Sequence, residues 1–251
     1  MERIVKETQI SLKKNFVYMI SFFVWGFVIL LIFLLFAPDL PNVNNSAFLT
    51  FPYPLENLEK VSETIKIYHD EAFIFTLTFF IATYLVLQSL AIPGPICLSF
   101  MAGSIFGRWI GLIIVTFCAT VGSAFCYLLY QRFGKGLVIR LFPAFIKKVS
   151  EQVLMNKEKL FNFLILLRVM PVVPNWVINF SSPVVGIPFW KFVLATFLGL
   201  IVPNFIQISA GIALKDMSQK GTDYYSLAVI GGIVVLAVLP MVCGKKDKVK
   251  V

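Results

Sequence analysis

Arg168 lies in an apolar stretch with two asparagines and four prolines, a combination suited to holding an anion away from water. The stretch, Leu166 to Pro188, reads LLRVMPVVPNWVINFSSPVVGIP. The planar fork of donors on an arginine matches the oxygens of a phosphate or carboxylate. Asn175, Asn179 and Ser182 follow within a few helical turns and add neutral hydrogen-bonding groups. These residues are therefore candidates to line a polar path.

The prolines predict that this stretch turns back instead of forming one straight helix. Proline removes a backbone donor and its ring disrupts the preceding turn. We expect breaks at Pro171, Pro174 and Pro183 here, and at Pro93, Gly94 and Pro95 in an earlier stretch. Ser99 and Ser104 follow that earlier break and are further candidates for the path. Irregular backbone at membrane depth occurs only inside protein or along a water-filled cavity.

The composition places these breaks in an integral membrane protein. The chain has 251 residues, of which 59% are hydrophobic and only 14% charged, and its mean hydropathy is +0.86. Such values lie outside ordinary soluble compositions. Several apolar runs approach the roughly 20 residues that cross the hydrocarbon core: 16–37, 73–91, 109–130, 189–214 and 224–243. The first lacks a small-residue cleavage site, which favours a retained helix over a signal peptide.

The charges predict which segments share a side of the membrane. Basic residues gather before the first run, between residues 132 and 159, and in the tail after residue 244, whereas the segment 38–72 is mainly acidic. By the positive-inside rule, both termini and the middle segment are cytoplasmic. Segment 38–72, with a possible glycosylation site at Asn44, is then on the opposite side.

The number of crossings between these segments predicts two hairpins that enter from opposite sides. If residues 109–130 cross the membrane once, segment 73–107 must leave and return on the outer side, or cross twice. If the last two apolar runs cross once each, segment 160–188 must enter and return on the cytoplasmic side. Val173-Pro174 and Trp190 repeat the spacing of Ile92-Pro93 and Trp109. We therefore expect an all-α polytopic membrane protein, an inverted repeat with two oppositely oriented re-entrant hairpins plus full transmembrane helices.

The motifs carry a family resemblance. The runs AIPGPICLSFMAGSIFG, TVGSAFCYLLYQRFGK and LRVMPVVPNWVINFSSPVVGIPFWKF resemble the VTT-domain proteins of the DedA superfamily, also called SNARE-associated Golgi proteins, and within it the eukaryotic transmembrane protein 41 (Stasimon-like) branch. The resemblance covers roughly residues 73–214. It implies re-entrant hairpins, residence in the endoplasmic reticulum and energy-independent scrambling of phospholipids, which supports autophagosome and lipoprotein formation. We predict an anchor helix and lumenal loop at 1–72, the core at 73–214, and a last helix with a basic tail at 215–251.

Two other functions stay open beside a scramblase. Bacterial relatives have acidic residues in the first hairpin, but no Asp or Glu occurs at 72–130 or 160–214. This absence disfavours an ion- or solute-coupled transporter, which needs an ionisable group at membrane depth. A non-transporting assembly factor that recruits partners through the basic middle segment is compatible with the motifs.

In the scramblase hypothesis Arg168 meets the lipid phosphate. It could equally snorkel or satisfy carbonyl groups freed by the prolines. Asn175 and Asn179 are more often helix or turn caps.

The remaining expectations concern partners and chemistry. We expect phospholipids as substrates and an anionic lipid surface as partner of the helical stretch 145–161, although a solvated loop helix explains it equally well. Nucleic-acid binding is not supported, because the basic residues lie at the ends of apolar runs. The sequence offers no metal site, no cofactor motif and no catalytic assembly, so we do not expect an enzyme.

Overall fold

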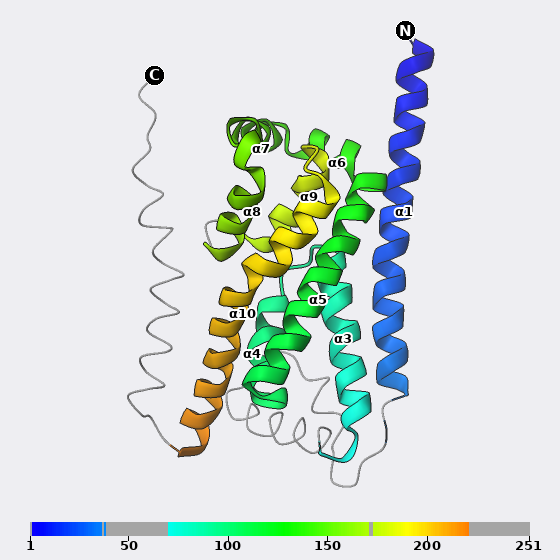
Figure 1. Cartoon of the computed structure of the whole chain (residues 1–251). Helices are drawn as coiled ribbons and strands as arrows, with labels where there is room; N and C mark the ends of the chain where they lie inside the picture. Colours follow the sequence, from blue (N-terminus) through cyan, green and yellow to red (C-terminus); the bar gives the residue numbers. More distant parts are fainter. Residues whose placement is uncertain (1, 37, 39–69, 171–172, 221–251) are drawn as a thin grey trace.

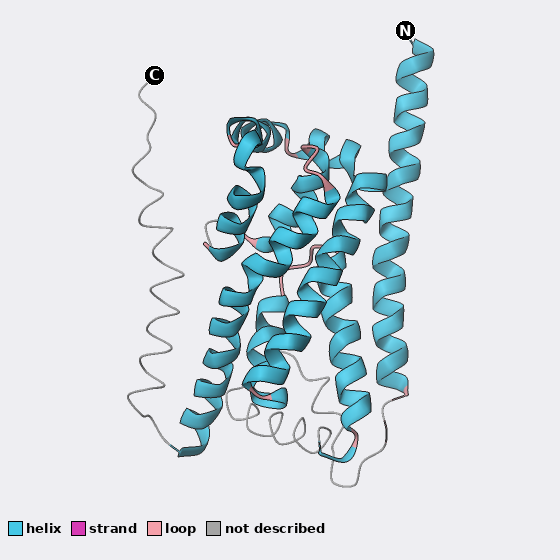
Figure 2. Cartoon of the chain, viewed as in Figure 1, coloured by secondary structure: helices cyan, strands magenta, loops and turns pink. Residues whose placement is uncertain are grey.

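The computed structural model describes residues 2–36, 38, 70–170 and 173–220, and this part of the chain is almost entirely helical (Figures 1 and 2). The helices are α1 (Glu2–Leu35), α3 (Phe73–Ser89), α4 (Pro95–Phe106), α5 (Arg108–Leu129), α6 (Lys135–Leu141), α7 (Pro143–Met155), α8 (Leu160–Val169), α9 (Asn175–Val184) and α10 (Phe189–Lys220). A π-helical turn, η2 (Tyr130–Gly134), joins α5 to α6, and a 3₁₀ turn, η3 (Lys157–Lys159), precedes α8. The expected run 224–243, the tail and the possible glycosylation site at Asn44 lie outside the described residues.

Three of the described helices are long and apolar enough to cross a membrane. The candidate spans are Lys14–Leu35, Arg108–Leu141 and Phe189–Ala213, which confirms three of the expected runs. The second is longer than predicted because η2 and α6 continue α5. Large apolar side chains on these helices are exposed, among them Trp25, Trp109 and Ile113. An exposed apolar surface of this extent is typical of a protein surrounded by lipid. The chain is an integral membrane protein.

Two helical hairpins turn back near the middle of the molecule, one from each end (Figure 1). The pair α3 and α4 turns at residues 90–94, and the pair α8 and α9 turns between residues 169 and 175. Helices α8 and α9 have ten residues each, about 15 Å at 1.5 Å per residue and half the thickness of a hydrocarbon core. Neither is long enough to cross a bilayer alone.

The long helices α5 and α10 form the centre against which the hairpins pack. Helix α4 packs on α10 as well as on α5, while α9 packs on α5 and α8 packs on α10. The backbones of α8 and α9 make few close approaches to each other. The second hairpin is therefore splayed, and its two arms are held by different central helices.

Glycines allow α4 and α10 to approach closely. A Cβ on Gly211 would overlap the carbonyl oxygen of Phe100, and one on Gly103 would overlap that of Ile208. Close approach through small residues is a common way for membrane helices to pack. Ser104 strengthens the same crossing, because its hydroxyl donates to the Gly211 carbonyl oxygen at 3.0 Å. Beyond it, Lys215 donates to the Ser104 carbonyl oxygen at 2.7 Å.

The segment between α6 and α8 differs from the single helical stretch expected at 145–161. Helix α7 ends at Met155, and η3 separates it from α8. Asn156 leaves the helical conformation (φ −105°, ψ 18°), and its side-chain amide donates to the Gln152 carbonyl oxygen at 2.8 Å. Asparagine favours such helix ends because its short amide competes for backbone groups.

Candidate functional site

Arg168 is buried where the second hairpin meets α10. Only 3% of its surface is exposed. Its Nη2 donates to Asn179 Oδ1 at 2.7 Å and to Thr196 Oγ1 at 2.9 Å, and its Nη1 donates to Asn175 Oδ1 at 3.3 Å. The guanidinium carbon also lies 5.1 Å from the ring centroid of Phe192. One cation therefore links α8, α9 and α10.

The local sequence explains how these groups converge. Arg168 is the next-to-last residue of α8, at the tip of the first arm of the hairpin. Asn175 begins α9 directly after Pro174, and Asn179 follows one turn later on the same face. On α10, Gly199 provides the space, since a Cβ there would lie 2.6 Å from the Arg168 Cβ. The guanidinium can thus reach both asparagines from the opposite arm.

All the hydrogen-bond acceptors of Arg168 in the described part of the chain are neutral. The Thr196 hydroxyl accepts from the guanidinium and donates to the Phe192 carbonyl oxygen at 2.7 Å. The Asn179 side chain is fully buried, and its Nδ2 has no hydrogen-bond partner among the described residues. A buried cation without a negative partner is costly. The site is consequently rich in donors and suited to an anionic group.

The first hairpin repeats this arrangement with an uncharged residue. Gln88 is the next-to-last residue of α3, and its Nε2 donates to Ser123 Oγ on α5 at 2.9 Å. A Cβ on Gly122 would lie 2.6 Å from the Gln88 Cβ. In both hairpins, a polar residue at the tip of the first arm packs on a glycine of the following long helix and bonds to a hydroxyl there. Gln88 is thus the counterpart of Arg168.

More polar side chains follow one face of α5 inside the protein. Thr116, Thr120 and Ser123, spaced at i, i+4 and i+7, are all buried. Asn204 on α10 donates to the Thr116 hydroxyl at 3.2 Å. This face begins at the first hairpin tip, where Ser123 bonds to Gln88, and extends along α5 to Thr116 as a polar strip among apolar residues.

The predicted residues occupy four different environments. Arg168, Asn175 and Asn179 come together as described, while the Ser182 hydroxyl donates to the Ile178 carbonyl oxygen within α9. Ser99 lies in the first hairpin, near Tyr84 (oxygen to oxygen 3.2 Å), and Ser104 lies at the α4–α10 crossing. The structure therefore brings only three of the six predicted path residues into one cluster.

The predicted breaks also differ in their outcome. Pro93 and Gly94 lie in the first turn, and Pro95 begins α4. Pro174 directly precedes α9, whereas Pro171 lies outside the described residues. Pro183 lies inside α9, and the helix ends one residue later at Val184. A proline this far into a helix lacks the backbone donor and its ring crowds the preceding turn, which favours a helix end close to Pro183.

Sequence reasoning missed Thr196, Gln88, Ser123, Thr116 and Asn204. A usable signal existed for three of them. Thr116 and Ser123 share a helical face with Thr120. Gln88 is also the one glutamine between residues 73 and 130. Thr196 carries no such signal, since its role depends on how α10 packs against α8.

The bond between Gln88 and Ser123 gives a testable stability prediction. We expect Gln88→Leu and Ser123→Ala each to lower stability, with a coupling energy of about 1 kcal/mol in a double-mutant cycle. Thermal or denaturant unfolding in detergent micelles measures it. Thr78→Ala is the matched control, because the Thr78 hydroxyl is exposed and bonds only to its own helix. A Gln88–Ser123 coupling no larger than the Gln88–Thr78 coupling would contradict the prediction.

The described residues hold no group of three or more His, Cys, Asp or Glu side chains that could bind a metal. Cys118 and Cys126 are buried free thiols, and Cys97 is an exposed one. In this part of the chain, then, the chemistry available at the hairpin tips is hydrogen bonding and the charge of Arg168.

Comparison with known proteins assigns the family. Residues 92–213 match the VTT domain, a range that begins within the turn of the first hairpin, after Gln88, and contains the whole second hairpin. The chain is 32% identical to a transmembrane protein 41 homolog of Caenorhabditis elegans over 232 residues, which cover 88% of this chain and 94% of the relative. It is 36% identical to transmembrane protein 41B of Danio rerio, over 78% of this chain and 70% of the relative. It is 34% identical to transmembrane protein 41B of Homo sapiens, over 79% of this chain and 69% of the relative.

No solved structure matches the chain. The VTT-domain match and the identity along most of the worm relative agree with each other and with the motifs around the hairpin tips. The chain belongs to the transmembrane protein 41 family of VTT-domain membrane proteins.

Proposed function

We propose that this protein is an energy-independent phospholipid scramblase of the endoplasmic reticulum membrane, which redistributes lipid for autophagosome and lipoprotein formation. The observation that carries the proposal is Arg168, a buried cation whose described partners are all neutral. A phospholipid headgroup always brings a negatively charged phosphate. Such a phosphate would supply the missing negative partner while the acyl chains stay in the surrounding lipid.

The same proposal includes an inverted repeat whose two hairpins are re-entrant. Its support is the paired arrangement of Gln88 with Ser123 and of Arg168 with Thr196, each beside a glycine of the following helix. The exchange of partners between the halves adds to it, since α4 packs on α10 and α9 packs on α5. In this architecture substrate sites lie near the bilayer midplane, where the interrupted helices meet.

A path for headgroups would run past both hairpin tips. The slow step in lipid exchange is taking a charged headgroup through hydrocarbon. The splayed arms α8 and α9, bridged by Arg168, mark the place where a headgroup would enter. There the phosphate would replace Asn175 and Asn179 as acceptor from the guanidinium, and the Asn179 Nδ2 would gain an acceptor. From Gln88 and Ser123, the polar face of α5 would continue the path toward Thr116 and Asn204.

No fuel is needed for such exchange, because movement follows the concentrations of lipid in the two leaflets. The absence of Asp and Glu from residues 72–130 and 160–214 fits this reading better than ion coupling, which needs a titratable group at membrane depth. In this proposal the termini face the cytoplasm, as the positive-inside rule predicts.

Reconstitution tests the proposal directly. The purified full chain is placed in vesicles that contain a fluorescent phospholipid, and dithionite is added outside without ATP or an ion gradient. We expect quenching to pass the outer-leaflet half in vesicles that exclude dithionite. Protein-free vesicles are the control for spontaneous exchange. Quenching that stops at half, in vesicles shown to contain folded protein, would refute scrambling by this chain.

A further inference from the structure

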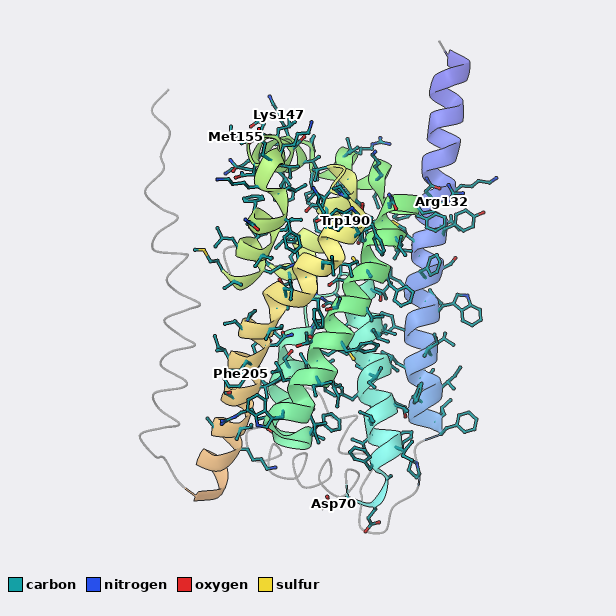
Figure 3. All side chains as sticks on the ribbon, in the orientation of Figure 1. Asp70, Arg132, Lys147, Met155, Trp190 and Phe205 are labelled. Carbon is teal, nitrogen blue, oxygen red and sulfur yellow. The ribbon has the colours of Figure 1, made fainter. Side chains whose placement is uncertain are left out.

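The end of the molecule that carries α6 and α7 has an exposed basic surface. Between residues 130 and 160 the chain has seven basic residues and two acidic ones, Glu151 and Glu158. We call five of the exposed basic residues the basic end surface: Arg140, Lys147, Lys148, Lys157 and Lys159. Figure 3 shows Lys147 and Met155 at this end and Asp70 at the opposite end. The basic residues of this segment thus lie on one side of the protein.

Large apolar side chains lie in the same segment and are exposed as well. Leu154 and Met155, at the end of α7, are 67% and 77% exposed. Leu141 and Phe142, at the start of the segment, are 59% and 50% exposed. They alternate along the chain with Arg140 and with the lysines at 157 and 159. Apolar side chains next to lysines are typical of segments at a membrane interface, where the apolar groups enter lipid and the ammonium groups stay among headgroups.

The inner face of α7 is already occupied. Phe145 and Ile146 pack against the cluster formed by Cys126, Val138, Phe180 and Val184. Lys147, Lys148 and Glu151 lie on the opposite side of the helix and are exposed. Helix α7 is therefore fixed to the bundle by one face and presents its charged face outward. This packing fixes the positions of Lys147 and Lys148 relative to the rest of the helix bundle.

We propose that the basic end surface binds the headgroups of anionic phospholipids in the leaflet that borders this end of the protein. The protein is embedded in lipid, so these headgroups are the nearest source of negative charge. Each lysine close to an anionic surface contributes favourable binding, and the contributions add. The exposed Leu154 and Met155 set this surface apart from a merely solvated one, because they gain nothing from water. The proposal does not depend on lipid scrambling.

Lipid selectivity in vesicles tests this proposal. The full chain is reconstituted in phosphatidylcholine that contains a trace of spin-labelled phosphatidylserine or spin-labelled phosphatidylcholine. The motionally restricted fraction of each label reports how strongly that lipid associates with the protein. We expect phosphatidylserine to associate more strongly than phosphatidylcholine, by a factor on the order of five. This factor corresponds to the contribution of one lysine near an anionic headgroup. In the combined variant K147Q, K148Q, K157Q and K159Q the ratio should fall close to one.

A matched control removes the same charge elsewhere. The variant K245Q, K246Q, K248Q and K250Q loses four lysines from the tail and should keep the preference. Salt provides a second test that needs no variant, because about 1 M salt shortens the Debye length to roughly 3 Å and should remove the preference of the native protein. The proposal is overturned if the preference survives in the first variant, if the tail variant loses it equally, or if salt has no effect. A native protein without any preference would equally overturn it and would point to an acidic protein partner.

Discussion

Replacing Arg168 with leucine will slow phospholipid exchange at least about tenfold, while the protein still inserts and folds. A hydrogen bond to a charged group contributes about 1.5–3 kcal/mol, and about 1.4 kcal/mol corresponds to a factor of ten in rate. The guanidinium is the described charged group at the tip of the second hairpin, and its described partners are neutral. Leucine removes that charge without adding a polar group to a buried site. The dithionite assay measures the rate.

Two further variants separate this role from a structural one. Arg168→Lys keeps the charge but loses the planar fork, so we expect an intermediate rate. Arg132→Gln removes one positive charge from an exposed position and should leave the rate unchanged. If Arg168 only ties α8 to α9 and α10, Arg168→Leu will instead lower the unfolding temperature while the folded fraction exchanges lipid at the native rate. That outcome would remove Arg168 from the proposed path.

The largest loss of stability is expected from Gly211→Ala. A Cβ at this position would overlap the Phe100 carbonyl oxygen, and a backbone atom cannot rotate away as a side chain can. Helix α4 would have to separate from α10, which would also weaken the bond from Ser104 to the Gly211 carbonyl oxygen. We expect a cost of about 3 kcal/mol, at the upper end for overpacking. Unfolding in detergent micelles measures it.

Leu198→Ala is the control for this prediction. Leu198 lies on the same helix and is 46% exposed, so its truncation leaves no enclosed cavity and should cost far less. Gly103→Ala should behave like Gly211→Ala, because it affects the same crossing at Ile208. The two costs should not add, since the first substitution already separates the helices. A Gly211→Ala protein as stable as Leu198→Ala would show that α4 and α10 pack less closely than described.

Sequence reasoning was most successful for segments whose conformation depends on their own residues. Three of the five long apolar runs are candidate spans, and Pro93, Pro95 and Pro174 lie where the hairpins turn. It was less successful where the conformation of a segment depends on how the helices pack. The break at Asn156 was missed because the helical pattern continues across it.

The candidate site likewise combines residues that local sequence identifies with contacts that depend on helix packing. Arg168 stood out because a charge is rare in an apolar segment, and the motif placed Asn175 and Asn179 beside it in sequence. Thr196 is 28 residues away from Arg168 along the chain. Gln88 and Ser123 are 35 residues apart. Such pairs arise from how the helices cross, which no local pattern in one sequence reports.

The π-helical turn η2 contains the equivalent of one extra residue inside an otherwise continuous helix. Such turns arise when a helix gains a residue and keeps its ends in place. A chain shortened by one residue within 130–134 could continue as regular α-helix with α6 in its present orientation. If the full-length chain instead adopted regular α-helix here, everything after the turn would rotate by about 100°. Val138, buried against Phe180 and Val184, would then leave the core. The packing of α6 on α9 therefore depends on the length of this turn as well as on the side chains in it.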